Sequence, residues 1–450
     1  MSTEEQGPTL HVHVMSGSAE LPTGMELRVA GDTRACLQLA DSEVRVHVAL
    51  EARARTEMRW LVDGIIRRVG ALTRVGPACI HGHDGVDDDT LVTLGLDLYR
   101  RCSGAVEIAE RPALQARVKT TGALLDQYCD WINEDPATRT SLAIARDVAN
   151  FGDDHATVNV DVLAEAALTD LGLRLLLAVG AGSPASPPRL VIARYRPPGC
   201  EPDTPYLMLL GKGITFDSGG INVKPYESFV SMMKNDMGGA ALAFALFRGL
   251  VEAGHDQPLL LVLPTCENAV DGNSMRPGAL VTSYRGHRVR IDHTDAEGRL
   301  ALADGLAYAS QLYPTRQVLS FATLTTSALV SYGPYATPVH FADSAFEGAL
   351  RAASEATGED LHFFPERIWH SEANRDQEAD LRNTARLPGH AARGAGSRNA
   401  AHFLRFFTDA PLCHFDIFGS TWNWAGDAPG AGYGATGAPL RTLLRAFGVG

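Results

Sequence analysis

Three short apolar runs, separated by helical patterns, most constrain how this 450-residue chain can fold. The runs Tyr206–Leu210, Leu259–Leu263 and Val318–Leu324 have the length of strands and contain no charged side chain. Strands of this kind are buried on both faces, which requires helices on both sides of their sheet. Helix and strand patterns alternate through this part of the chain, which is typical of α/β proteins. The sequence therefore predicts a mixed sheet flanked by helices, with helices expected over 237–253, 299–312 and 439–447.

The first part of the chain has a different pattern. Leu10–Val14 and Val44–Val48 alternate apolar and polar side chains, as half-buried strands do. Helical patterns are expected from about 55 to 68 and over most of 114–150. The chain is long enough for two or three domains, and a boundary is predicted near Asn150–Asp154. We therefore predict an α/β fold in two parts, with a smaller α/β N-terminal domain over residues 1–155 and a larger domain over residues 156–450.

Composition and charge limit the classes of partner. The formal net charge of −13 argues against unspecific nucleic-acid binding, which needs a basic surface. The segment Met1–Gln6 is polar, so we expect no signal peptide, and no apolar stretch reaches the roughly 20 residues of a membrane span. Seven cysteines, an odd number without C-x-x-C spacing, are typical of reduced thiols. The sequence thus predicts a cytoplasmic protein that binds neither membranes nor nucleic acids.

Two segments combine carboxylates with cationic side chains: Gly211–Gly220 (GKGITFDSGG) and Thr294–Arg299 (TDAEGR). Four carboxylates brought together would repel one another strongly unless a multivalent cation neutralised them. A pair of divalent metals that shares bridging carboxylates meets this requirement. The candidate residues, two of which follow the first segment, are the carboxylates Asp217, Asp236, Asp295 and Glu297 and the cations Lys212, Lys224 and Arg299.

The first segment is also well placed in the expected fold. Lys212 and Asp217 are expected just past the carboxyl end of the strand Tyr206–Leu210, and open α/β sheets bind their ligands at that edge. The glycines of this segment allow the backbone to bend sharply and to approach an ion closely. We therefore expect the metal site at this edge of the sheet.

These two segments resemble the motifs of the leucyl aminopeptidase family of dinuclear metallopeptidases. They are most similar to the bacterial peptidase B branch, whose first motif also reads G-K-G-I-T-F-D-S-G-G. The resemblance extends from about Leu190 to the C-terminus, and the first 150 residues lack it, which fits the variable N-terminal domain of the family. Further matching stretches are Glu267-Asn268, Gly272-Asn273, Arg276–Gly278, Ala322–Thr325, Gly396, Ala400-Ala401, Phe403-Leu404, His414–Ile417 and Gly434–Gly437.

The resemblance implies a set of metal ligands. Lys212 would bind one metal through its side-chain nitrogen, together with Asp236. Asp295 would bind the other metal, partly through its backbone carbonyl, while Asp217 and Glu297 would bridge the two. Oxygen-rich ligation with one nitrogen suits manganese or zinc, and magnesium and cobalt stay open. The family would thus supply two divalent metal ions per subunit.

The resemblance also implies an activity. A hydroxide that bridges the two metals would hydrolyse the N-terminal peptide bond of short peptides. Lys224 would polarise the scissile carbonyl, and Arg299 would hold a bicarbonate ion that acts as general base. The backbone around Thr323, Leu324 and Thr325 would orient the substrate. Family members form homohexamers whose active sites face an interior cavity, so the substrates would be short peptides.

The sequence departs from the family pattern at a few positions, which are Ala279, Asp292, His293 and Thr326. His293 replaces the usual asparagine before the second motif and could be an extra ligand, a proton relay or a hydrogen-bond donor behind the ligands. These changes keep two alternatives open besides the enzyme. One is a catalytically weak or inactive member that serves as a structural subunit, and the other is a DNA-binding subunit.

The N-terminal part also contains histidines within expected strands and in one acidic segment. The segment His81–Asp89 lacks the spacing of a calcium loop, so we expect a strand end followed by an acidic helix cap. His11, His13 and His47 alternate with apolar residues along expected strands, and we predict that they are surface side chains.

Overall fold

The computed structural model describes residues 77–386 and 395–449, except positions 84, 103, 366, 425 and 427, and parts of the first 67 residues (9–16, 25–28, 34–39, 43–50, 59, 60, 63, 64 and 67). Contacts between residues divide the chain into two compact units. The N-terminal unit combines Met1–Asp126 with Ala349–Asp360 and Asn423–Gly450, and the larger unit combines Gln127–Gly348 with Leu361–Trp422.

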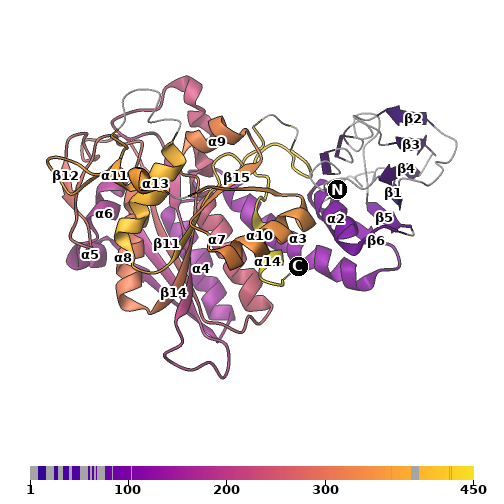
Figure 1. The fold of residues 1–450 in the computed structure, drawn as a ribbon, viewed down its shortest axis with the longest axis horizontal. Helices are drawn as coiled ribbons and strands as arrows, with labels where there is room; N and C mark the ends of the chain where they lie inside the picture. The colour runs from indigo at the N-terminus through magenta and orange to yellow at the C-terminus, as the bar shows by residue number, and fades with distance from the viewer. Residues whose placement is uncertain are drawn as a thin grey trace, which may run out of the picture. The chain divides into compact units, whose positions relative to one another are not determined.

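The N-terminal unit contains a six-stranded sheet (Figure 1). Its strands are β1 (Thr9–Ser16), β2 (Met25–Arg28), β3 (Arg34–Leu39), β4 (Glu43–Leu50), β5 (Ala78–Gly82) and β6 (Val106–Ile108), in the order β2-β3-β4-β1-β5-β6. β1 pairs in parallel with both β4 and β5. Leu10, Val12 and Val14 are fully buried on one face of β1. Because side chains alternate along a strand, His11 and His13 lie on the opposite face.

Ion pairs tie the later segments of this unit to helix α2 (Asp88–Arg101). Asp97 of this helix accepts hydrogen bonds from Arg59, at 3.0 and 2.9 Å, and pairs with Arg441 of helix α14 (Leu440–Ala446) at 2.8 Å. These charges are buried, and Arg59 also donates to the carbonyl of Gly358 at 3.0 Å. Removing one partner of a buried ion pair strongly destabilises the folded protein, because it leaves a buried charge without a counter-charge. The pair of Asp97 with Arg441 therefore favours one position of α14 against α2.

The larger unit contains a nine-stranded mixed sheet (Figure 1). Its strands are β7 (Val158–Leu163), β8 (Arg189–Tyr195), β9 (Tyr206–Gly211), β10 (Gly213–Asp217), β11 (Leu259–Asn268), β14 (Thr315–Ala322), β15 (Ala336–His340), β16 (Asp360–Phe363) and β18 (Leu412–Asp416). The order is β16-β15-β18-β14-β9-β11-β8-β7. β10 pairs with the last residues of β11, after the part of β11 that pairs with β9. The central strands β11, β9, β14 and β18 are parallel. β8 is antiparallel to β11, β7 to β8 and β15 to β18.

Helices cover both faces of this sheet, as the apolar strands require. On one face, Met208 and Leu210 of β9 pack in a core with helices α6 (Arg174–Gly180) and α8 (Gly298–Leu312). On the other face, Leu207 and Leu209 are fully buried as well, and helix α7 (Gly238–Glu252) contacts β9. Each leucine removed from water in this way contributes roughly 2 kcal/mol, which holds the central strands firmly.

The other described elements are mostly short. They are the helices α3 (Pro112–Asn133), α4 (Ser141–Asp154), α5 (Glu165–Leu171), α9 (Thr326–Tyr332), α10 (Ser344–Thr357), α11 (Ile368–Glu372) and α13 (Gly396–Leu404), the 3-10 helices η1 (Tyr226–Ser228), η2 (Val230–Met237) and η3 (Arg405–Phe407), and the small sheet of β12 (Leu280–Thr282), β13 (Arg288–Arg290) and β17 (Leu381–Arg382). Among the described helices, none has both the length and the hydrophobicity needed to cross a bilayer.

The α/β fold predicted from the sequence is confirmed, including its mixed sheet. Asp217 is the last residue of a further short strand, β10, that follows β9. Residues 150–154, near which the boundary is predicted, form the last turn of α4. The division into domains at residue 155 stays a prediction, and the helix expected over 55–68 lies mostly outside the described residues.

Candidate metal centre

The predicted ligands converge because several segments of the larger unit end at one edge of the sheet. Lys212 follows β9 directly, and Asp217 ends β10. Asp236 lies in the 3-10 helix that leads into α7, while Asp295 and Glu297 lie just before α8. The carboxyl ends of parallel strands are the usual ligand-binding edge of an α/β sheet. The candidate residues therefore lie at the edge of the sheet where the sequence predicts them.

The Lys212 side chain points into this cluster. Its Nζ lies 2.8 Å from Asp236 and 2.9 Å from Glu297 Oε1, and it donates to the carbonyl of Thr323 at 2.9 Å. Only 2% of Lys212 is exposed. Burial disfavours the charged ammonium, but the carboxylates of Asp236, Glu297 and Asp217 outweigh burial and raise the pKa of Lys212. The lysine predicted to be a ligand therefore lies among the carboxylates and not in solvent.

Lys224 holds the other side of the cluster. Its Nζ lies 2.8 Å from Asp217 Oδ2 and also contacts Asp295 Oδ1. Burial opposes the charge of Lys224, but Asp217, Asp295 and Glu297 raise its pKa. These carboxylates therefore favour the protonated form of Lys224.

The carboxylates lie so close together that the positive charges of Lys212 and Lys224 do not neutralise their negative charge. One oxygen from each of Asp217, Asp295 and Glu297 lies within 4.8 Å of the others. Burial and the charges of Asp217 and Glu297 raise the pKa of Asp295 to about 7. Burial, followed by Glu297 and Asp217, raises the pKa of Asp236 well above its usual value despite Lys212. A surplus of negative charge on hard oxygen donors fits divalent cations.

Hydrogen bonds fix the two motifs to each other. Asp217 accepts from the backbone N–H of Gly219 at 2.9 Å and from Asn268 Nδ2 at 2.7 Å. The same Asn268 amide donates to the carbonyl of Thr294 at 3.1 Å, and Thr294 Oγ1 donates to the carbonyl of Gly219 at 2.6 Å. Gly219 has a φ of +88°, and a β-carbon there would lie 2.5 Å from the carbonyl oxygen of Asn222. A glycine is therefore required where the first motif turns.

Arg299 is buried behind the carboxylates. Its Nε has no hydrogen-bond partner among the described residues. Burial lowers the pKa of Arg299 to about 10, although Glu297 and Asp416 oppose the shift. A buried guanidinium with an unused donor is suited to an anion.

The segment predicted to bind substrate is held by Asp416, at the end of β18. Asp416 Oδ1 accepts from the backbone N–H of Leu324 at 3.2 Å and of Thr325 at 3.3 Å, and Oδ2 accepts from Thr325 Oγ1 at 2.6 Å. Thr323 Oγ1 donates to the carbonyl of Asp236 at 3.0 Å. The structure thus directs Thr323 towards the metal ligands, whereas the N–H groups of Leu324 and Thr325 are directed towards Asp416.

Asn268 and Asp416 belong to this centre but were not among the predicted site residues. Each is the last residue of a strand, β11 or β18, whose carboxyl end lies at the same edge as the ligands. The sequence signal that could have identified them is a polar residue at the carboxyl end of an apolar strand, the edge where α/β sheets bind ligands.

Three of the residues that depart from the family pattern differ in what they contact. His293 is exposed, and its Nδ1 accepts from the backbone N–H of Asp295 at 3.2 Å. Asp292 pairs with Arg382 and accepts from Thr384 at 2.7 Å. Ala279 packs beside the core that contains α6 and α8. In this geometry His293 supports the loop of Asp295 through a hydrogen bond.

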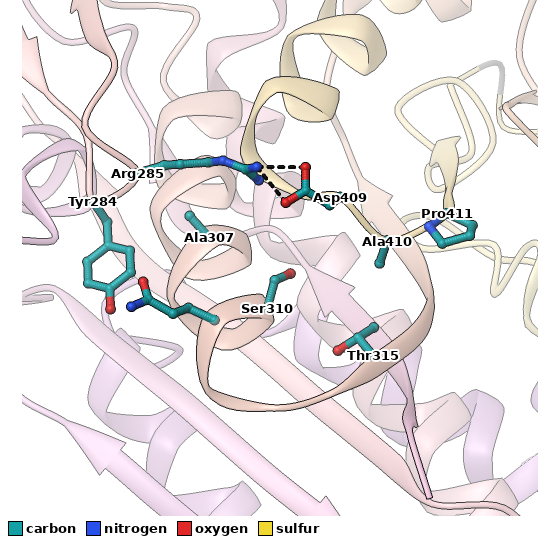
Figure 2. A pocket seen from close by; sticks show the side chains of 9 residues that line it. Tyr284, Arg285, Ala307, Ser310, Thr315, Asp409, Ala410 and Pro411 are labelled. Carbon is teal, nitrogen blue, oxygen red and sulfur yellow. Dashed lines mark hydrogen bonds and ion pairs between the residues drawn. The ribbon is translucent and has the colours of Figure 1, made fainter.

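A separate hollow of about 560 Å³ lies beside the last turns of α8 (Figure 2). Its lining includes Ala307 and Ser310, near the end of α8, and Thr315, at the start of β14. Arg285 spans part of it to Asp409, with two contacts of 2.7 Å. Because this hollow adjoins the amino end of β14, it is not the metal centre.

Comparison with known proteins points in the same direction as the geometry. A sequence profile described as "Cytosol aminopeptidase family, catalytic domain" matches residues 128–444. The chain belongs to this family. The match contains all of the predicted metal ligands, and the likeness to the peptidase B branch stays a prediction.

Individual members of the family support this assignment. A "Probable cytosol aminopeptidase" of Acidovorax sp. (strain JS42) is 36% identical over 316 residues, which cover 70% of this chain and 60% of that protein. One of Burkholderia mallei (strain SAVP1) is 37% identical over 355 residues, 78% of this chain and 67% of that protein. The chain thus spans about three fifths of the length of the first of these relatives.

A solved structure matches nearly the whole chain. It is the "Bottromycin maturation enzyme BotP in complex with Mn", with a TM-score of 0.82 and 28% sequence identity. The match covers 97% of this chain and 98% of that chain, so it includes the N-terminal part as well.

Proposed function

We propose that this protein is a metal-dependent aminopeptidase that removes the N-terminal residue of short peptides. The observation that carries the proposal is the convergence of Asp217, Asp295 and Glu297 within 4.8 Å, beside a buried Lys212. Membership of the cytosol aminopeptidase family supports the activity. The similar BotP structure is a complex with manganese, which supports a metal of this type.

The proposed ligands hold two divalent cations, manganese or zinc. Lys212 and Asp236 would bind one ion, and Asp295 the other, with Asp217 and Glu297 shared. Such cations supply Lewis acidity and an activated water at neutral pH. Lys212 has to lose its proton to become a ligand. Without metal ions, the neighbouring carboxylates raise the pKa of Lys212 and favour the protonated form. Metal binding is therefore expected to release protons.

The chain's own residues position the substrate and stabilise charge. Lys224, held between Asp217 and Asp295, keeps its proton and would donate to the carbonyl oxygen as negative charge develops there. Arg299, with its unused Nε, would bind a bicarbonate ion that accepts and returns the proton of the reaction. Thr323, Leu324 and Thr325 would line the substrate position, with Asp416 fixing their backbone.

The remaining parts of the proposal concern the whole protein. The proposed location is the cytoplasm, and the proposed assembly is a homohexamer that admits short peptides. Residues 1–155 would form the variable N-terminal domain and residues 156–450 the catalytic domain.

The test is release of the first residue from a panel of dipeptides and amino-acid amides, with manganese, zinc, cobalt or magnesium. The expected result is metal-stimulated release from unblocked peptides and none from N-acetylated ones. Asp217→Ala should lose both activity and bound metal. Absence of metal-stimulated release across the panel would contradict the proposal. If Asp217→Ala also retained the metal content of the wild type, the results would favour the alternative of a catalytically inactive structural subunit.

A further inference from the structure

A cluster of imidazoles and one thiol lies on the N-terminal sheet, outside the catalytic centre. Because β1 and β5 are parallel and in register, His11 lies opposite Cys79 and His13 opposite His81. On the other side of β1, His13 lies opposite His47 of β4. These side chains share the face of the sheet opposite the buried Leu10 and Val12, so neighbouring strands bring them together.

The ligand atoms of three of these residues are close enough for one ion. His11 Nδ1 lies 3.0 Å from His81 Nε2. One ligand atom from each of His11, Cys79 and His81 lies within 4.8 Å of the other two. All three side chains are half-buried, so their orientation is constrained by the strands while a small ion retains access.

Further histidines surround this group. The His13 ring stacks on that of His81, with centroids 4.4 Å apart, and on that of His47, at 4.5 Å. His13 Nδ1 also lies 3.3 Å from His83 Nε2. Burial, followed by the charges that His81, His47, His83 and His11 would carry, lowers the pKa of His13 to about 4. His11, His13 and His47, which were predicted to be surface side chains, are partly exposed, and their rings also lie close to other histidine rings.

We propose that His11, Cys79 and His81 form a second metal site that binds zinc, a cation that accepts imidazole and thiolate ligands. Two nitrogens and one sulfur suit zinc, which is usually four-coordinate, and leave one position for water or for a neighbouring histidine. The catalytic carboxylates are hard oxygen donors, so the two centres differ in the ions that they prefer. Since zinc binds the thiolate, its binding releases the proton of Cys79.

Cobalt(II) is the probe that separates the two centres, because it replaces zinc and absorbs in the near ultraviolet when bound to a thiolate. The proposed catalytic ligands include no sulfur, so such a band would report Cys79. The experiment uses the full chain, titrated with cobalt and then with competing zinc, while manganese is in excess. Zinc uptake is measured in parallel by equilibrium dialysis.

The expected result is a thiolate–cobalt band that reaches one ion per chain and disappears as zinc is added. Cys79→Ser should abolish the band, and His81→Gln should weaken cobalt and zinc binding by about 100-fold or more, because each removes one of the side-chain ligands. The matched controls are Cys200→Ser and His362→Gln, which change the same residue types in the larger unit. Circular dichroism and the catalytic manganese content show whether each variant is folded.

A wild-type protein without the band, or a folded Cys79→Ser variant that keeps it, would overturn the proposal. Equal zinc binding by the wild type and His81→Gln would do so as well. The outcome is independent of the proposed peptidase activity. Asp217→Ala should lose activity while keeping the thiolate–cobalt band.

Discussion

The Lys212 side chain lies directly against the backbone of Gly298. A β-carbon built on Gly298 would lie 2.3 Å from Lys212 Cε and 2.6 Å from its Nζ. Gly298 is the first residue of α8 and follows the ligand Glu297. The glycine of the second motif therefore leaves room for the lysine of the first, because a β-carbon at position 298 would force the Lys212 side chain to shift.

Gly298→Ala is expected to move Lys212 away from Glu297 and Asp236. Overpacking of this kind typically costs about 1–3 kcal/mol of unfolding free energy, and we expect metal affinity to fall at least ~10-fold. Metal content and thermal denaturation check this. The control is Gly348→Ala in α10, where a β-carbon would meet nothing within 4 Å. Normal metal affinity in Gly298→Ala would mean that Lys212 is not a ligand.

Lys224→Ala tests the proposed stabilisation of developing charge. We expect kcat to fall by about 10²–10³, as when an oxyanion donor is removed, while bound manganese stays close to the wild-type amount. Steady-state kinetics and metal analysis measure both quantities. Lys119→Ala, on the exposed surface of α3, is the matched control. An unchanged kcat in Lys224→Ala would remove this residue from the mechanism.

Thr325→Val tests whether Asp416 positions the substrate segment. The change keeps the shape of the side chain but removes the 2.6 Å hydrogen bond to Asp416 Oδ2. A lost hydrogen bond to a buried charge typically costs roughly 1–3 kcal/mol. Because the segment would become less fixed, KM should rise more than kcat falls. Equal kinetics for Thr325→Val and the wild type would show that this contact does not orient substrate.

Unfolding free energy should depend on pH through His414 of β18. Burial and Arg299 lower the pKa of His414 to about 3 from an ordinary value of 6.5. The unfolded chain therefore binds the proton first, so stability is complete above pH 6.5 and is lost as pH falls towards 3. The loss from this residue is about 1.4 kcal/mol per pH unit.

His414→Gln should flatten the fall in unfolding free energy between pH 6 and pH 4, measured by denaturant titration. His362→Gln, at an exposed position, should leave the slope unchanged. A slope that is the same in His414→Gln and the wild type would mean that His414 is not buried as a neutral ring.

The central strands and the convergence of the candidate ligands were predictable from the sequence for different reasons. Tyr206–Leu210 contains only apolar residues, so burial on both faces was the one arrangement that satisfies it, and this prediction is confirmed. The ligands carry an unusual density of charge, which indicated a cation even before the family was considered. The prediction of a cation site therefore did not require the ends of the strands to be predicted correctly.

Other features depend on contacts that a sequence does not contain. The Asp416 carboxylate fixes Leu324 and Thr325 only because β14 and β18 are neighbours, although they are far apart in the chain. The cluster of His11 with His81 likewise depends on the register of two parallel strands. Strand order and register result from the packing of the whole domain, so alternation alone could only assign these histidines to a surface.

The central claim is tested most directly by counting the manganese ions bound to the catalytic centre. The measurement is equilibrium dialysis on a Cys79→Ser/His81→Gln background, in which the proposed second site is removed. The account predicts two ions per chain, and loss of manganese binding when Asp217→Ala is added. Binding of no manganese, or binding that Asp217→Ala leaves unchanged, would contradict it.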